Sequence, residues 1–199
     1  GGLPALQSVA AWREVGSSRV LSTDGGPVRI SAVPIAASAT DVLGVQPALG
    51  RFFTEDEDRP GGGRRIVLST GTWRRYFGSD GSIVDRTVLL DDEPFLVVGV
   101  MPEGFDFPGA ADAWIPLAPG AGRSRDDKEL AVFARLSPGI TLERARADVR
   151  VFADRLGLLY PEANGGWSAD AMAFSTWLVA PRFRDAVWML FGAVALLLL

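Results

Sequence analysis

The stretch Thr87–Val100, TVLLDDEPFLVVGV, predicts the most clearly defined element of the chain, a β-hairpin with one apolar face. Branched and large apolar residues favour strands over Thr87–Leu90 and Phe95–Val100. The Asp91-Asp92-Glu93-Pro94 segment between them is typical of a turn, because Asp adopts turn conformations readily and Pro interrupts a strand. We therefore expect a β-sheet to be built around this hairpin.

The residues before the hairpin predict a buried strand followed by a short helix. Ile66-Val67-Leu68 is a short apolar run typical of a core strand. Ser69 or Thr70 can cap the helix that follows, and Gly78 can close it. Three aromatic residues fall at helical spacing and are expected to pack on the adjacent sheet: Trp73, Tyr76 and Phe77.

Further upstream, apolar residues alternate with other residues within residues 6–36, and this pattern predicts strands. Asp24-Gly25-Gly26-Pro27 is a strong turn signal within this region. Ser38 or Thr40 can cap a short helix, and Gly44 suits its left-handed end.

The residues after the hairpin predict a connector and two strands. Phe105 and Phe107 lie in the Pro- and Gly-containing segment Met101–Pro108 and are expected to fasten it to the core. Strands are expected over Trp114–Leu117 and Leu130–Leu136, and Pro119–Asp127 has the composition of a linker.

The last predicted elements form a β-α-β unit. Thr141 is expected to cap a helix over residues 142–159, which Pro161 stops. Ala169–Phe174 is interpreted as a returning strand. One apolar stripe of the helix consists of Leu142, Ala145, Val149, Phe152, Ala153 and Leu156.

Composition excludes several functional classes. The 199 residues include no cysteine and no histidine, so disulfides, thiolate nucleophiles, the usual zinc ligands and imidazole bases are all absent. The net charge of −4 argues against a nucleic-acid partner, which normally needs a basic face. The chain is 48% apolar, enough for a substantial core.

Three local patterns suggest chemistry, but each has a simpler interpretation. Glu55-Asp56-Glu57-Asp58 lacks the spacing of a calcium loop and is interpreted as a solvated loop. Gly61-Gly62-Gly63-Arg64-Arg65 precedes a strand, whereas a phosphate loop would follow one. Ser69 and Thr70 lack the G-x-S-x-G context and are interpreted as helix caps. We therefore predict no catalytic, cofactor-binding or metal-binding residues, and no enzymatic activity.

The final residues, Ala186–Leu199 (AVWMLFGAVALLLL), carry no charged side chain and are apolar on every helical face. A helix of this length reaches about 21 Å, short of a bilayer core of about 30 Å. We interpret the run as the truncated start of a transmembrane helix rather than a soluble core helix. Arg182 and Arg184 precede it, although positive residues favour the cytoplasmic side.

Five segments form one recognisable pattern when they are taken in order: Asp41–Asp58, Ile66–Asp80, Arg86–Pro108, Trp114–Leu117 and Ala134–Val149. Together they resemble the MacB-like periplasmic core domain of ABC transporter permeases, the family that includes FtsX-like proteins. Two turn positions depart from the family pattern, because Asp85 and Asp92 stand where glycine is common; Asp tolerates left-handed backbone, so the turns are expected to persist.

The resemblance implies an α+β, two-lobed extracytoplasmic domain with mixed β-sheets, over residues 1–182. A porter-like lobe would comprise about 1–46 plus 120–182, with a small inserted lobe at about 47–119 and the start of a transmembrane helix at 183–199. It implies a bacterial inner-membrane permease subunit with the domain on the periplasmic side, working with an ABC ATPase subunit or domain.

The implied function is transmission of ATP-driven conformational change, with Arg182–Trp188 as the coupling joint. A permease dimer and a periplasmic adaptor are possible further partners. Two alternatives stay open: a membrane-tethered module that binds a ligand or partner, and a membrane-anchored hydrolase, which the missing His and Cys disfavour.

Overall fold

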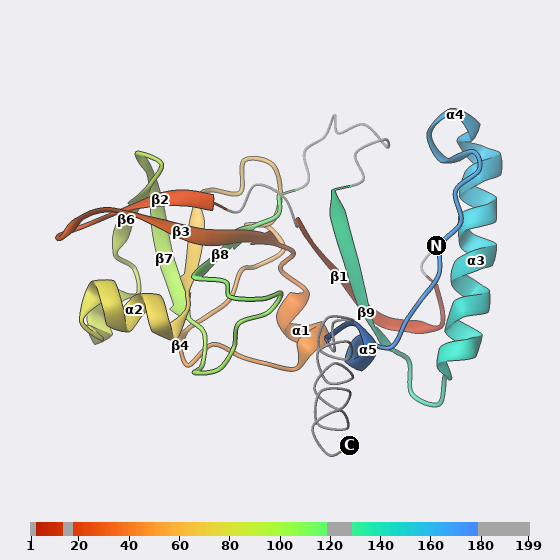
Figure 1. Ribbon diagram of the computed structural model, residues 1–199, viewed down its shortest axis with the longest axis horizontal. Helices are drawn as coiled ribbons and strands as arrows, with labels where there is room; N and C mark the ends of the chain where they lie inside the picture. The colour runs from red at the N-terminus through yellow and green to blue at the C-terminus, as the bar shows by residue number, and fades with distance from the viewer. Residues whose placement is uncertain (1–2, 14–17, 119–128, 179–199) are drawn as a thin grey trace, which may run out of the picture. The chain divides into compact units, whose positions relative to one another are not determined.

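The computed structural model describes residues 3–13, 18–118 and 129–178 (Figure 1). The chain forms two compact units, Leu6–Arg135 and a second unit of Gly1–Ala5 with Leu136–Leu199. The predicted linker Pro119–Asp127 and the apolar run Ala186–Leu199 lie outside the described residues.

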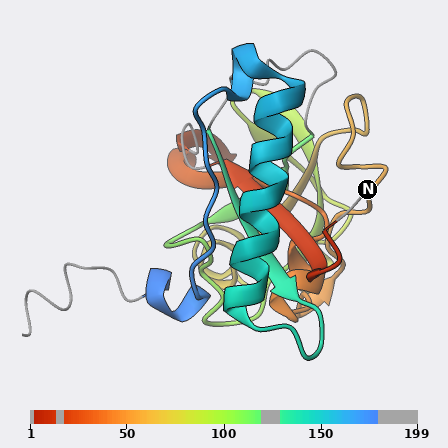
Figure 2. The ribbon, with the colours of Figure 1, turned by 90° about the vertical axis from the view of Figure 1, so that its right-hand side faces the viewer.

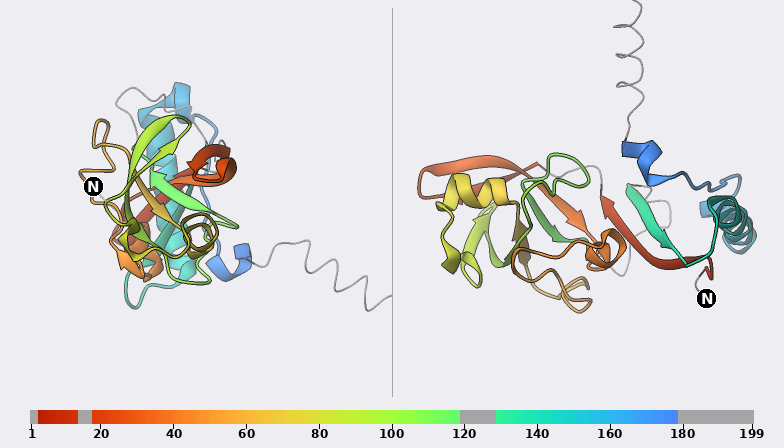
Figure 3. Two further views of the ribbon diagram at one scale, coloured as in Figure 1. Left: turned by 90° about the vertical axis from the view of Figure 1, so that its left-hand side faces the viewer. Right: turned by 90° about the horizontal axis from the view of Figure 1, so that it is seen from below.

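Six strands of the first unit close into a ring (Figures 1 and 3). β2 pairs antiparallel with both β3 and β6, and β7 pairs antiparallel with β6 and parallel with β5. β8 completes the ring by pairing antiparallel with β5 and parallel with β3. The strands are β2 Ser18–Thr23, β3 Gly26–Ile35, β5 Arg65–Leu68, β6 Thr87–Leu90, β7 Glu93–Val100 and β8 Ala113–Pro116. The result is a small mixed β-barrel, which confirms each strand predicted in this region.

The hairpin that anchors the barrel turns over two residues, fewer than the sequence suggested. Asp91 and Asp92 have φ of 51° and 63°, while Glu93 and Pro94 already belong to β7. Two positive φ angles give the turn whose twist matches that of paired strands. Asp85 also has positive φ, 67°, so the expectation that Asp tolerates these two turn positions is confirmed.

The barrel interior is filled by alternate side chains of its strands. Ile66 and Leu68 face inward from β5 and are fully buried, while Val67 between them joins the cluster outside. β7 changes face midway because its register with β5 shifts, pairing Ile66 with Val97 but Val67 with Gly99. The inner cluster comprises Leu21, Ile30, Ala32, Ile66, Leu68, Ile83, Val88, Leu90, Phe95, Val97, Val100, Ala113 and Ile115.

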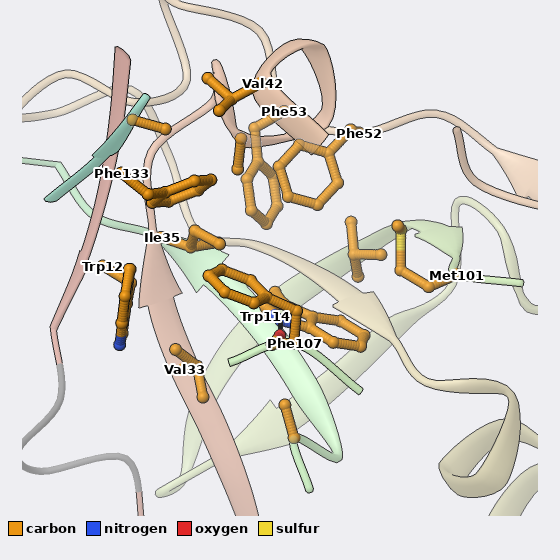
Figure 4. Close-up of a cluster of buried hydrophobic side chains, with 14 of the residues drawn as sticks. Trp12, Val33, Ile35, Val42, Phe52, Phe53, Met101, Phe107, Trp114 and Phe133 are labelled. Carbon is orange, nitrogen blue, oxygen red and sulfur yellow. Dashed lines mark hydrogen bonds between the residues drawn. The ribbon is translucent and has the colours of Figure 1, made fainter. Parts of the chain in front are cut away.

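A second, aromatic cluster packs against the outside of the barrel (Figure 4). Trp114 of β8 is fully buried there, and its indole Nε1 donates to the Phe107 carbonyl at 2.8 Å. The Phe107 ring lies 5.0 Å from that of Trp12 and 4.9 Å from that of Phe133, while Phe105 lies 5.2 Å from Trp114. The expectation that Phe105 and Phe107 fasten their connector to the core is confirmed.

Further elements surround this cluster: β1 Leu6–Arg13, α1 Ala39–Leu43, β4 Leu49–Gly50 and β9 Leu130–Leu136. β1 continues the sheet from β3, with Trp12 opposite Ile35, and β9 follows β1. Gly44 ends α1 in the left-handed conformation, as predicted, whereas Ser38 makes no capping bond and donates to the Val9 carbonyl.

Helix α2, Thr70–Phe77, covers one side of the inner cluster of the barrel, and the 3-10 turn η1, Gly81–Ile83, follows it. The Ser69 hydroxyl accepts the Thr72 N–H at 3.1 Å, and Gly78 ends the helix with φ of 59°. The three aromatic residues of α2 pack against the barrel cluster as predicted: Trp73, Tyr76 and Phe77.

The second unit contains the helices α3 Leu142–Leu159, α4 Pro161–Asn164 and α5 Phe174–Leu178. Thr141 caps α3 by accepting the Arg144 N–H, so the predicted start and end of this helix are confirmed. Of the expected apolar stripe, Ala145 is fully buried, whereas Phe152 is 40% exposed.

The predicted returning strand at Ala169–Phe174 is wrong. Residues 169–173 belong to no strand, and α5 begins at Phe174. This segment runs back along α3 (Figure 2) and is held there by the Arg146 side chain, whose Nε donates to the Ala171 carbonyl at 2.6 Å. Three of its six residues are alanine and one is aspartate, and both residue types are depleted in strands.

Two expectations about organisation stand apart from these results. Within the described residues, no helix has both the length and the apolarity needed to cross a bilayer. The division into lobes at 47–119 and at 1–46 with 120–182 stays a prediction. The two compact units divide the chain at other points, because β3, from residues 1–46, pairs with β8, from residues 47–119.

Candidate functional site

The acidic loop between β4 and β5 contains the most elaborate polar arrangement in the described chain. The expectation of a solvated loop is wrong for half of it, because Glu57 is buried and Asp58 is partly buried. Glu55 and Asp56 are exposed, as expected. We call the set Arg51, Glu57, Asp58 and Arg65 the acidic clasp.

Glu57 is held by two arginines and one backbone amide. Arg51 donates through both terminal nitrogens, Nη1 to Oε2 and Nη2 to Oε1, each at 2.7 Å. Arg65 Nε donates to Oε1 at 2.9 Å, and the Thr54 N–H donates to Oε2 at 3.0 Å. A bidentate, charge-assisted pair of this kind is strong and directionally fixed.

This arrangement fixes the ionisation state of Glu57. The hydrogen bond from Arg51 lowers the pKa of the Glu57 carboxyl to about 2, against the opposing effect of burial, with the Thr54 N–H and Arg65 adding to the decrease. The same pairing raises the pKa of Arg51. At neutral pH Glu57 is therefore an anion whose two oxygens are already occupied, which suits a structural tie and not proton transfer.

Asp58, the next residue, ties together the ends of two barrel strands. Its Oδ2 accepts the Ala37 N–H at 2.9 Å, just after β3, and its Oδ1 accepts the Ala118 N–H at 2.7 Å, just after β8. The Leu117 N–H also donates to the Ile35 carbonyl at 3.0 Å. One carboxylate thus joins both chain segments at the point where they leave the barrel.

Glycines allow the backbone to approach closely enough to form the clasp. Gly50 of β4 pairs with Gly99 of β7, and a Cβ on Gly99 would meet the carbonyl oxygen of Arg51 and lie 2.9 Å from that of Leu49. A Cβ on Gly62 would meet the carbonyls of Asp56 and Glu57. Substituting either glycine would therefore displace backbone that presents the clasp side chains.

The other sequence candidates have structural roles. Arg65 belongs to the clasp, and Arg64 pairs with Glu93 at 2.6 Å, so both arginines of the glycine-rich segment are engaged by carboxylates. Ser69 caps α2, and the Thr70 hydroxyl donates to the Met101 carbonyl at 2.6 Å. Among residues 3–13, 18–118 and 129–178, no group of three or more His, Cys, Asp or Glu could hold a metal ion.

No spacing rule in the sequence pointed to the clasp. Arg51 and Glu57 are six residues apart in a loop, and Arg65 comes from the following strand. The one usable signal was the pair of glycines at 50 and 99, which the β4–β7 pairing brings opposite each other.

The second unit presents a surface rich in exposed apolar side chains. Leu158 is the most exposed of them, at 84%, and lies beside Trp167 in a shallow groove lined also by Asp154 and Asn164. Further along the chain, the rings of Phe174 and Trp177 stack with their centroids 5.7 Å apart. Exposed apolar groups gathered in this way usually mark contact surfaces.

Comparison with known proteins places this geometry in a family. Residues 2–151 match the MacB-like periplasmic core domain. This match covers most of the chain, and the protein belongs to that family. It is therefore a mixed α/β extracytoplasmic domain of the kind found in MacB-like and FtsX-like ABC transporter permeases, which work with an ATPase.

Three crystal structures share the fold. The extracellular domain of the noncanonic ABC-type transporter YknZ from Gram-positive bacteria has a TM-score of 0.61 at 18% identity, covering 82% of this chain and 81% of that one. The periplasmic region of MacB from Actinobacillus actinomycetemcomitans gives 0.58 at 20% identity, covering 80% and 70%. A domain of a putative permease from Porphyromonas gingivalis gives 0.55 at 13%, covering 89% and 81%. No curated protein matches the sequence.

Proposed function

We propose that this domain transmits ATP-driven conformational change from the membrane part of a permease to the periplasmic side, for export or another envelope process. The domain moves as packed units and performs no chemistry itself. Family membership supplies the setting, and the construction of the Leu6–Arg135 unit supports the mechanical role.

The observation that carries the proposal is the closure of the barrel together with the clasp. In the ring of six strands, each strand is hydrogen-bonded on both sides, so displacement of one strand moves its neighbours. Asp58 joins the exits of β3 and β8, and β3 continues the sheet into β1 and β9. A force applied at these exits is therefore passed to the whole unit rather than absorbed by one loop.

The remaining components of the mechanism lie outside the described residues. ATP would be hydrolysed in the cytoplasm by a separate or fused ATPase, and the permease would sit in the bacterial inner membrane. Ala186–Leu199 would begin a transmembrane helix, with Arg182–Trp188 as the joint between helix and domain. A second permease subunit and a periplasmic adaptor are further proposed partners.

A flexible insertion tests whether coupling through this joint must be stiff. In the full-length permease, a Gly/Ser linker after Pro181 should abolish the ATP-dependent change in distance between spin labels on Val132→Cys and Val194→Cys. The same linker in the exposed Asp24-Gly25 turn should leave that change intact, because this turn closes the β2–β3 hairpin and is not part of the segment that connects the domain to the apolar run. An unaltered distance change after the Pro181 insertion would show that stiff coupling is wrong.

The groove beside Leu158 and Trp167 favours a second candidate, a membrane-tethered module that binds a ligand or a partner. Such a module needs no ATP-dependent displacement. The labels on Val132→Cys and Val194→Cys therefore separate the two functions. A distance between them that does not change with ATP but changes when a partner is added would favour the binding module.

A further inference from the structure

Three large apolar side chains are exposed within six residues near the end of the described chain. Met172 is 63% exposed, and Phe174 and Trp177 are each more than one-third exposed. The two aromatic rings stack at 5.7 Å with an angle of 24° between their planes. We call Met172, Phe174 and Trp177 the apolar edge. A cluster of this composition in contact with water is costly and points to a contact partner.

The position of the apolar edge in the sequence indicates what that partner is. Trp177 precedes Ala186, the start of the uncharged apolar run, by nine residues. Nine residues span at most about 30 Å when extended and about 13 Å as a helix. If the apolar run enters a bilayer, the apolar edge therefore lies within about 30 Å of the lipid headgroups and is able to reach them. Tryptophan and other aromatic residues are enriched at that depth because they combine an apolar body with a polar group.

We infer that the apolar edge rests in the headgroup region of the membrane and sets the orientation of the second unit on it. This inference rests on the proposed function, specifically on the membrane tether at Ala186–Leu199. It adds a lipid-contacting surface within the folded part of the domain, separate from the transmembrane helix itself.

The contacts within the second unit determine which end of α3 faces the membrane. Arg146 Nε donates to the Ala171 carbonyl at 2.6 Å, and Arg150 pairs with Asp170 at 3.4 Å, so the segment leading to the apolar edge lies beside the first half of α3 (Figure 2). Leu158 is twelve residues beyond Arg146, about 18 Å further along the helix axis. The start of α3 therefore faces the lipid, and the groove at Leu158 lies farther from it.

The contact should depend on apolar burial and little on lipid charge. Between the apolar edge and the apolar run, the charged residues are Arg182, Arg184 and Asp185, and the whole chain carries a net charge of −4. Attraction to anionic lipid needs a cluster of several basic residues, which this segment lacks. Binding of the apolar edge should thus be similar on neutral and on anionic bilayers.

Single-cysteine labelling tests the inference directly, because the chain has no native cysteine. Met172→Cys, Leu158→Cys and Val194→Cys, each in the full chain and carrying the fluorophore NBD, would be reconstituted in phosphatidylcholine vesicles with and without doxyl-labelled lipid. The label at Met172→Cys should be quenched by shallow doxyl groups at least about twofold more than that at Leu158→Cys. Adding Phe174→Ser with Trp177→Ser to Met172→Cys should remove most of this quenching.

The three labels separate failure of the inference from failure of the tether. Quenching at Val194→Cys without quenching at Met172→Cys overturns the inference and leaves the tether standing. Quenching at Met172→Cys alone supports the inference and contradicts the tether, and quenching at neither contradicts both. A Met172→Cys label shielded from aqueous iodide as well as from doxyl lipid would show that protein covers the apolar edge, which also overturns the inference. Quenching that appears only when phosphatidylglycerol is present would indicate electrostatic adsorption and would likewise overturn it.

Discussion

Removing the charge of Glu57 should destabilise the barrel unit by an amount that depends on pH. The decrease of its pKa from 4.5 to about 2 corresponds to about 3 kcal/mol of folding free energy. Because the Arg51 side chain is 51% exposed, solvent screens part of that interaction, and we expect Glu57→Gln to cost about 2 kcal/mol at pH 7. Urea unfolding of the full chain in a non-ionic detergent, followed by tryptophan fluorescence, measures the difference.

The sign of the pH dependence follows from the direction of the pKa change. The folded state holds Glu57 ionised more strongly than the unfolded state does, so this stabilisation is complete above pH 4.5 and is lost as the pH falls through about 2. The difference between the native chain and Glu57→Gln should therefore shrink steadily below pH 4.5. A difference that stays constant from pH 7 to pH 2.5 would refute the reasoning.

Glu103→Gln is the matched control for this experiment. Glu103 also forms a bidentate pair, with Arg74 at 2.7 Å and 3.1 Å, but its side chain is 74% exposed. Exposed pairs contribute little to stability, so the unfolding midpoint should not change measurably. An equal loss in both variants would show that burial of Glu57 is not what makes the clasp strong.

Two backbone predictions concern the strands that carry the clasp. Gly99→Ala should lower the free energy of unfolding by about 2 kcal/mol because β4 would have to move off β7, whereas Gly81→Ala, with open space around its Cβ, should be neutral in the same denaturation assay. Asp92→Gly should raise the stability by up to about 1 kcal/mol because φ is 63° there, and Asp92→Ala should lower it; thermal melting measures both, and a stabilising Ala would contradict the turn geometry.

Local sequence signals predicted the elements of the fold well. The strand at Ile66–Leu68, the cap at Ser69 and the helix at Leu142–Leu159 each depend on neighbouring residues alone, and each is present as expected. These features are encoded within a few residues, which is the range over which propensity and capping act.

Closure of the barrel could not be predicted in this way. It requires β2 to meet β6, and the ion pair between Arg19 and Asp91 that accompanies this pairing joins residues 72 positions apart. The burial of Glu57 could not be predicted for the same reason, because one of the arginines that bind it, Arg65, comes from the next strand. An acidic run is interpreted as solvent-exposed unless the cationic side chains that neutralise it are known, and here one of them comes from another strand.

The returning strand failed for a related reason. A returning strand at Ala169–Phe174 would need a free sheet edge to pair with, and this segment is held along α3 by Arg146 instead. Family resemblance indicated what local signals could not. Five matching segments in order predicted the MacB-like periplasmic core domain, and the family match over residues 2–151 confirms it.

The most direct test of the account is whether the Leu6–Arg135 unit moves as one body during the ATP cycle. Spin labels on Leu89→Cys and Val132→Cys, both exposed and both in this unit, would be compared with labels on Val132→Cys and Val194→Cys in the reconstituted permease. We predict that trapping with ATP and vanadate leaves the distance distribution of the first pair unchanged and shifts that of the second. A shift within the first pair, or no shift in the second, would contradict rigid transmission.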